Sequence, residues 1–378
     1  MLDDALPEPP HTMFASDNAS GIHPRYLDAI ARANVGHELA YGDDPFTATA
    51  TQMFRDLCGT DLSVLFCFGG TGANVLALSL LLERGESIIC TSKAHIAVDE
   101  TGAPEKILGV KLHSVPTTDG KLSPSHIHEL ARELGNMHHV QPGVVSISQP
   151  TELGTLYSID EIADIVEAAH SYGMRVHVDG ARIANAVAAL GVNQTSNSNS
   201  GVAFNSVVFR AMTFDIGVDA VSFGGTKNAM LHAEAVLMSP TPGGPHAHGA
   251  KSQELLVKQG AYMRKQVTQL PSKMRFNSVQ FIEAFTDDLW LQTAHSANGS
   301  ARLLYESLAD LSELGLQMPQ VNSLYPLLPD PAKSYLQSWC FFWDWDRSID
   351  QVRWMTSWDT TSDDIERFST GVRAALAH

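Results

Sequence analysis

The stretch RVHVDGARIANAV, residues 175–187, changes its pattern at one point. Polar and apolar residues alternate as far as Asp179, which is typical of a short β-strand, and an Ala-rich helical pattern follows. Asp179 and Arg182 therefore stand where a strand passes into a helix. Such a pair is either a solvated ion pair at a turn or part of a site at the carboxyl edge of a sheet, where open α/β folds bind their ligands.

The composition predicts a compact globular protein of the enzyme type. The chain has 378 residues, of which 44% are hydrophobic and 18% charged, so two domains with a large core are expected. The net charge of −17 argues against nucleic acid and anionic membranes as partners, because phosphates are bound mainly by Lys and Arg. The chain starts without signal-peptide features, and no apolar run reaches the ~20 residues of a membrane span. We expect a soluble cytoplasmic protein whose four cysteines are reduced core thiols.

Short β-rich runs alternate with helical segments over the first two thirds of the chain. Helix start signals precede some of these segments, for example Ser123-Pro124 and Ser158 followed by Glu161. The alternation predicts an α/β fold in which helices cover a mostly parallel seven-stranded sheet. The seven expected strands are residues 62–68, 87–92, 110–115, 143–148, 175–179, 219–225 and 233–239.

A segment rich in Pro, Gly and His at residues 239–251 indicates a domain boundary. We expect a large domain at residues 1–250 and a smaller α+β domain at residues 251–378. A polar segment at residues 193–201 is interpreted as a surface loop.

The C-terminal part is expected to begin with helices and to continue with strands at residues 338–346 and 351–359, before a closing helix that starts at SDDIE. His246 and His248 stand near its beginning. They lack the carboxylate or cysteine neighbours of a metal site, so no metal is expected.

Two further segments could carry chemistry at the same edge of the sheet. GGTGAN, residues 69–74, follows a strand and opens a helix, so free backbone N–H groups and the hydroxyl of Thr71 could hold a phosphate; a tight turn is the alternative. Lys227 follows an apolar strand and two glycines, where burial would make its amine a nucleophile for Schiff-base chemistry; a solvated loop lysine is the alternative. Asp179 fits the partner of the pyridine nitrogen in pyridoxal phosphate (PLP) enzymes, and Arg182 could grip a substrate carboxylate.

Together these residues resemble the low-specificity L-threonine aldolase family, PLP enzymes of the aspartate aminotransferase fold type, fold type I. The resemblance covers nearly the whole chain, and YGDDP at 41–45 and HVDGAR at 177–182 are its most specific motifs. The other matching segments are Ser16-Asp17-Asn18, the GGTGAN phosphate loop, Ala94-His95, the lysine segment Gly225-Thr226-Lys227-Asn228 and Val352-Arg353-Trp354-Met355.

The resemblance implies retro-aldol cleavage of a β-hydroxy-α-amino acid, such as L-threonine, L-allo-threonine or phenylserine, into glycine and an aldehyde. It implies a homo-oligomer, expected as a dimer of dimers, in which Tyr41 reaches the site of a neighbouring subunit. The cofactor-binding residues that it implies are Gly70, Thr71, Asn74, His95, Asp179, Arg182, Thr226 and Lys227. The substrate-binding residues that it implies are Ser16, Tyr41, Arg182 and Arg353.

Lys227, His95, Asp179 and Glu152 are the expected catalytic residues, and one of them departs from the family pattern. Glu152 stands where many members carry a histidine near the substrate β-hydroxyl. The general base is therefore left open between His95, Glu152 and an ordered water. Another fold type I enzyme, an aminotransferase or a β-lyase, is the alternative function, and a non-catalytic binding protein on the same scaffold is a third.

Overall fold

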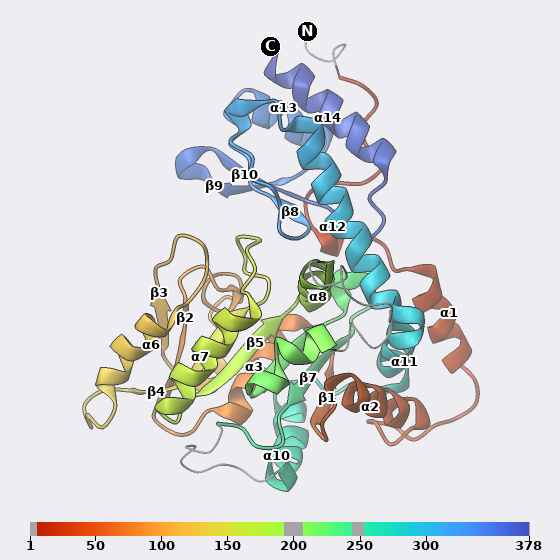
Figure 1. The fold of residues 1–378 in the computed structure, drawn as a ribbon. Coiled ribbons are helices and arrows are strands. Elements are labelled where there is room, and N and C mark those ends of the chain that lie inside the picture. The colour runs from red at the N-terminus through yellow and green to blue at the C-terminus, as the bar shows by residue number, and fades with distance from the viewer. Residues whose placement is uncertain (1–5, 193–206, 244–252, 378) are drawn as a thin grey trace.

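The computed structural model describes residues 6–192, 207–243 and 253–377. The polar segment 193–201 and both His246 and His248 lie outside these ranges. A large sheet with its helices forms one part of the molecule, and the C-terminal helices and strands lie together beyond one end of it (Figure 1). Helix α12 (Leu289–Leu308) runs between the two parts.

The large sheet has the order β1-β7-β6-β5-β4-β2-β3. All its strands run parallel except β7, which pairs antiparallel with both β1 and β6. Each expected strand is confirmed to within two residues at either end. The bounds are β1 Ser63–Cys67, β2 Glu86–Thr91, β3 Leu112–Val115, β4 Gln141–Ser148, β5 Arg175–Gly180, β6 Ala220–Gly224 and β7 Glu234–Met238.

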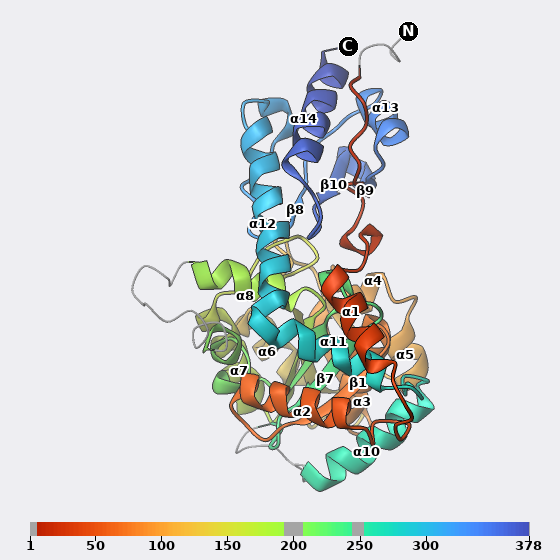
Figure 2. The same ribbon diagram turned by 90° about the vertical axis from the view of Figure 1, so that its right-hand side faces the viewer.

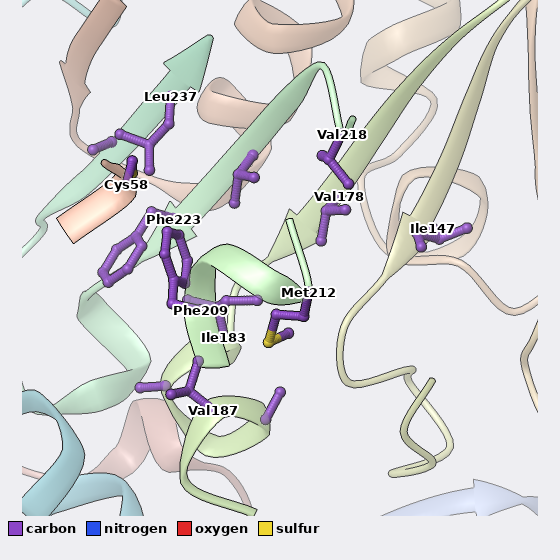
Figure 3. Close-up of a cluster of buried hydrophobic side chains, with 14 of the residues drawn as sticks. Cys58, Ile147, Val178, Ile183, Val187, Phe209, Met212, Val218, Phe223 and Leu237 are labelled. Carbon is purple, nitrogen blue, oxygen red and sulfur yellow. The ribbon is translucent and has the colours of Figure 1, made fainter. Parts of the chain in front are cut away.

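Helices cover both faces of this sheet, as the alternating pattern of the sequence predicts. Because successive side chains of a strand point to opposite faces, Phe66 packs in one buried cluster while its neighbours Leu65 and Cys67 pack in the other. Helices α3 and α10 supply the cluster around Leu65, and α2, α7, α8 and α11 supply the larger one. Figure 3 shows part of the larger cluster, where Phe223 of β6 lies beside Phe209, and where Ile183 and Val187 come from α8.

The helix start signals of the sequence are confirmed where they were expected. Ser158 caps α7 in a capping box with Glu161, and Ser123 caps α6 with His126. The described helices up to α8 are α1 Pro24–Ala33, α2 Pro45–Cys58, α3 Gly70–Leu81, α4 His95–Val98, α5 Ala103–Leu108, α6 Pro124–Leu130, α7 Ile159–Ser171 and α8 Ile183–Val192. Those after it are α10 Gln253–Gln266, α11 Arg275–Phe285, α12, α13 Ala332–Trp339 and α14 Ser362–Leu376. None of the described helices is both long and apolar enough to cross a membrane.

A second core lies between α12, α13, α14 and a three-stranded antiparallel sheet of order β8-β10-β9. These strands are β8 Ser323–Leu324, β9 Trp343–Asp346 and β10 Gln351–Met355. Helix α12 contributes Trp290 to the first core and Leu304 to the second. Shared helices of this kind do not define a boundary, so the division at residue 250 stays a prediction.

The expected strand at 338–346 was partly wrong. Its first two residues complete helix α13, and the strand proper covers only 343–346. Trp339 packs its indole on Phe368 of α14, so the aromatic residues that suggested a strand are here divided between a helix and a strand. The expected strand at 351–359 is also shorter and ends at Met355.

The N-terminal segment crosses the C-terminal core before it reaches the large sheet. Phe14 stacks on Phe368 with 4.1 Å between ring centroids, and the carbonyl of Phe14 accepts a hydrogen bond from the Met355 N–H. The backbone N–H groups of His11 and Thr12 donate to Asp364. Figure 2 shows this segment running beside β9 and β10 and then down to the sheet. The residues that follow Phe14 are therefore held between the two parts of the molecule.

The aromatic core predicts a stability difference between two phenylalanines. Phe281 is fully buried and contacts the rings of Phe54 and Phe66, whereas Phe341 is 39% exposed. Phe281→Ala should lower the free energy of unfolding by about 3–5 kcal/mol, and Phe341→Ala should lower it by well under half as much. Urea denaturation of both variants measures this, and equal losses would contradict the packing described.

Candidate active site

A cavity of about 340 Å³ opens at the carboxyl edge of the large sheet, where β1, β5 and β6 end. This is the edge at which the sequence placed its candidate residues. Seven of the eight expected cofactor-binding residues line it: Gly70, Thr71, Asn74, His95, Asp179, Thr226 and Lys227. The other lining residues are Asn18, Phe68, Gly69, Asp99, Ala181, His232 and Glu234. Arg182 does not line this cavity, although its neighbour Ala181 does.

The N-terminus of α3 presents open hydrogen-bond donors to the cavity. Gly69 precedes the helix in an extended conformation and no side chain caps it. The N–H groups of Gly70, Thr71 and Gly72 have no acceptor among the described residues. A Cβ at Gly72 would meet the end of the Gln269 side chain, which would have to move aside. Free donors and the helix dipole make this turn suited to an anion.

A chain of buried hydrogen bonds joins the acid and the histidine of the site. The Nδ2 group of Asn74 donates to Asp179 Oδ2 and to Glu100 Oε1, both at 2.8 Å. Glu100 Oε1 in turn lies 2.8 Å from His95 Nδ1. The side chain of Glu100 is fully buried. Asp179 also accepts the Ala181 N–H at 3.0 Å, so its carboxylate is fixed from two sides at the end of β5.

The charges in this chain of hydrogen bonds change the pKa of His95. The hydrogen bond that His95 Nδ1 donates to Glu100 raises the pKa of His95, burial opposes this rise, and the charge of Asp179 adds to it. A carboxylate on Nδ1 also fixes the tautomer of the neutral ring, with the proton on Nδ1 and a lone pair on Nε2. Nε2 is then the atom of His95 that can accept a proton in the cavity.

Lys227 stands just beyond β6, in a 3-10 turn (Thr226–Asn228). Its amine has no hydrogen bond or ion pair with any residue that the structure describes. Gly224, which ends β6, is needed here because a Cβ at this position would collide with the backbone of Ala181. The close approach of these two strand ends puts Lys227 and Asp179 on one cavity wall.

Arg182 is held by Asp17 of the N-terminal segment. Its Nε donates to Asp17 Oδ2 at 2.5 Å and its Nη2 to Asp17 Oδ1 at 3.0 Å. Both side chains are nearly buried, with 10% and 2% exposure. Burial would raise the pKa of Asp17, but the Arg182 guanidinium holds that pKa below its ordinary value. Asn322 also donates to Asp17, so this carboxylate joins three segments of the chain.

Arg353 is the second arginine near the site, and it lacks such a partner. Its Nη2 donates to the carbonyl of Ala15 at 3.3 Å, and its guanidinium lies over the ring of Trp345. Its Nε is buried without a hydrogen bond, and no carboxylate lies within 4.0 Å of it among the described residues. Burial lowers the pKa of Arg353, and the nearby charge of Arg182 adds to this. A ligand carboxylate would relieve this unpaired cation.

Glu152 lies in the loop after β4, close to Arg182. Its Oε2 is 4.0 Å from Arg182 Nη1, and its backbone carbonyl accepts the hydroxyl of Tyr325 at 2.7 Å. It does not line the cavity around Lys227. Glu152 therefore lies beside Arg182 and outside the cavity lining, although its charge adds to the rise in the pKa of His95.

The other two expected substrate-binding residues lie apart from each other. Ser16 directly precedes Asp17, and its Oγ accepts the N–H of Asn18, which lines the cavity. Tyr41 does not line the cavity of its own chain. Its ring is 48% exposed and lies under the ammonium group of Lys265 at 5.1 Å.

Three buried acids of the site were missed as functional residues at the sequence level. Asp17 lies within a matched motif, and Glu100 follows His95 by five residues, so both stood close to a signal. Glu234 stands alone at the start of β7, and no motif in the sequence marked it as a functional residue. Their partners come from distant parts of the chain, which no local pattern reveals.

The chain is similar to known proteins over nearly its whole length. A model of the beta-eliminating lyase family matches residues 13–327. A low-specificity L-threonine aldolase of Pseudomonas aeruginosa is 38% identical over 97% of this chain and 99% of its own length. The solved threonine aldolase of Leishmania major superposes with a TM-score of 0.81 at 27% identity, covering 96% of this chain and 98% of that one. An aspartate aminotransferase of Rhodobacter sphaeroides, at 14% identity and a TM-score of 0.64 over 98% of this chain and 92% of its own, shares the fold.

The architecture is thus that of the aminotransferase-like enzymes, and the expected fold class is confirmed. The chain belongs to the beta-eliminating lyase family.

The family implies PLP as cofactor, and the cavity residues fit this group. Its phosphate needs donors, which the open N–H groups of α3 provide. Its pyridine nitrogen needs an acid, for which Asp179 is fixed, and its aldehyde needs an unpaired lysine amine, which Lys227 has. The buried atoms Asn74 Oδ1 and Glu100 Oε2 have no hydrogen-bond partner either, as is common where a ligand completes a site.

The Glu100–His95 pair predicts a measurable pKa change. Glu100→Gln removes the negative partner of Nδ1, so the pKa of His95 should fall back toward its ordinary value. Titration of the His95 ring protons by NMR measures this, with the signal assigned from His95→Gln.

Glu105→Gln is the matched control, since Glu105 is exposed and only five residues away. It should leave the His95 titration unchanged. An unaltered His95 pKa in Glu100→Gln would show that Glu100 does not act on His95.

Proposed function

We propose that this chain is a PLP-dependent threonine aldolase that cleaves β-hydroxy-α-amino acids, including L-threonine and L-allo-threonine, into glycine and an aldehyde. A threonine aldolase is a carbon–carbon lyase. The observation that carries the proposal is one cavity that contains an unpaired Lys227, a fixed Asp179 and a carboxylate-bound His95, in a chain with full-length threonine aldolase relatives.

The cofactor would be held by residues of four segments. Lys227 would bind it covalently, and the α3 N-terminus with Thr71 and Thr226 would hold its phosphate. Asp179 would keep its ring nitrogen protonated, and His95 would face the ring. When bound, PLP supplies an electron sink for the pair released as the Cα–Cβ bond breaks.

The substrate carboxylate would bind Arg353 and Ser16. Arg353 is favoured over Arg182 because its Nε is unsatisfied, whereas Arg182 already makes two hydrogen bonds to Asp17. Arg182 would then contribute mainly by fixing Asp17 and the neighbouring Ser16. Holding the carboxylate in one place orients the Cα–Cβ bond, which decides which bond breaks.

The proton of the β-hydroxyl would be taken by His95 Nε2. Glu100 keeps Nδ1 occupied, and His95 lines the cavity with the amine of Lys227. Glu152 is less suited to this step because it lies beside Arg182. It could instead influence the choice of β-substituent. Loss of the hydroxyl proton expels the aldehyde, and protonation at Cα gives glycine.

The proposed oligomer is supported by the surface around Tyr41. Val35 and Leu39 in the same loop are 73% and 72% exposed, and Tyr41 does not line the cavity of its own chain. Exposed apolar side chains of this density suit a subunit interface. We propose a homodimer that shares its sites, with a dimer of dimers as the larger assembly, and a cytoplasmic location.

The role of Lys227 can be tested by substitution. Lys227→Ala should abolish both glycine and aldehyde release from L-threonine and remove the visible absorption of the bound cofactor, because the amine that holds it is gone. Lys333→Ala, at an ion pair in the C-terminal part, should behave as wild type. Full activity in Lys227→Ala would refute the proposed site.

The role of Arg353 in substrate binding can be tested by the effect of its substitution on KM. Arg353→Ala should raise KM for threonine by roughly 10- to 100-fold, since charge-assisted hydrogen bonds contribute about 1.5–3 kcal/mol. Arg347→Ala, whose side chain is 85% exposed, is the control and should leave KM unchanged. Steady-state kinetics decides, and an unchanged KM in Arg353→Ala would place the carboxylate elsewhere.

A further inference from the structure

Glu234 is a buried acid in the cavity to which the proposed reaction assigns no task. It is the first residue of β7 and only 5% exposed. Its strand partners are Gly224 at the end of β6 and Cys67 at the end of β1. Cys67 leads directly into the open N-terminus of α3, so Glu234 lies at the end of the cavity that suits an anion.

The carboxyl group of Glu234 would compete with a bound anion for hydrogen-bond donors at that end of the cavity. Its Oε2 accepts the Gly225 N–H at 3.2 Å. The carboxylate also accepts a hydrogen bond from the hydroxyl of Thr226, which lowers the pKa of Glu234. Thr226 Oγ also accepts the Ala233 N–H at 3.1 Å. An ionised carboxylate can only accept, so it takes the single hydroxyl proton of Thr226. A phosphate could then not receive that proton.

The charges that face Glu234 are few. Lys227 precedes it in the chain across the turn between β6 and β7, and His232 precedes it by two residues. The Cys67 thiol lies on β1, and Arg264 of α10 acts on that thiol. Burial raises the pKa of Glu234 to about 7, against the opposing effects of Thr226 and Lys227. Two negative groups in one poorly hydrated site repel strongly, so a bound phosphate would favour the neutral acid further.

We propose that Glu234 is a proton-dependent positioning residue for the phosphate end of the site. It takes one proton from solvent when a dianion binds, and the neutral carboxyl leaves the Thr226 hydroxyl free to donate to that anion. The inference rests on the proposed function, because the phosphate of PLP is the anion concerned.

The sign of the resulting pH dependence follows from linkage. The protonated site binds the anion better, so affinity is greatest below the pKa of Glu234 in the empty site. It falls as pH rises through that value, by up to about tenfold per pH unit. A glutamine at this position is neutral at every pH and should bind with the affinity that the wild type reaches at low pH.

Sulfate is a suitable probe because it is a dianion throughout this range and cannot react with Lys227. The full chain, stripped of cofactor, is titrated with sulfate from about pH 6 to about pH 8.5 at constant ionic strength. The saturable part of the shift in unfolding temperature gives the dissociation constant, separate from the general stabilisation by sulfate.

We expect the wild-type dissociation constant to rise about fivefold between about pH 7 and about pH 8, and to approach a tenfold rise per pH unit only at higher pH. Glu234→Gln should bind tightly with no such rise. Glu366→Gln, at an exposed position of α14, is the control and should keep the wild-type slope. If Glu234→Gln retains the wild-type slope, Lys227 or another group is titrating and the inference is wrong.

Two further outcomes separate this inference from the proposed function. A wild type that releases glycine from threonine but binds sulfate equally at all pH values overturns only the role of Glu234. A wild type that shows no saturable sulfate binding refutes the anion site as well. Should Glu234→Gln not fold, calorimetry of the wild type in two buffers of different ionisation enthalpy measures proton uptake on sulfate binding near pH 7, and zero uptake contradicts the proposal.

Discussion

The side-chain amide of Asn74 is the contact on which the rest of the site depends. Two buried carboxylates, Asp179 and Glu100, accept from the same Nδ2 group, so their mutual repulsion is offset where it would be largest. Because Asn74 lies in α3, the same helix that offers its open N-terminus to an anion also fixes the acid at the end of β5 and, through Glu100, the ring of His95. A single helix thereby sets the distances between its own open N-terminus, Asp179 and His95.

A second constraint separates the two arginines. The ion pair of Arg182 with Asp17 ties the central sheet to the N-terminal segment, which itself crosses the C-terminal core. Arg353 comes from that core and reaches the same segment through the carbonyl of Ala15, but its charge stays unpaired. Arg182 is thus held in a structural ion pair, whereas we propose that Arg353 binds the substrate carboxylate. The sequence made both arginines candidates for the substrate carboxylate, and only their partners in the structure distinguish them.

The sequence predicted the large sheet well because its strands are apolar on both faces and are punctuated by helix caps such as Ser158. The C-terminal part was less predictable, because the aromatic run before β9 fits a helix and a strand equally well. Only the packing of Trp339 on α14, which the sequence does not show, distinguishes the two. Residues that stand in recognisable motifs, such as Lys227, could be predicted from the sequence, and they do line the cavity. Glu100 and Glu234 could not be predicted, since a buried acid acquires its role only from neighbours that folding brings to it.

The central claim is that Lys227 holds the cofactor in the cavity where β1, β5 and β6 end. Borohydride reduction of the PLP-loaded protein makes the lysine–cofactor bond permanent, and proteolysis followed by mass spectrometry then identifies the labelled lysine. The account predicts one label per chain, on the peptide that contains Lys227. A label on any other lysine, or no label in protein that retains its cofactor, would contradict it.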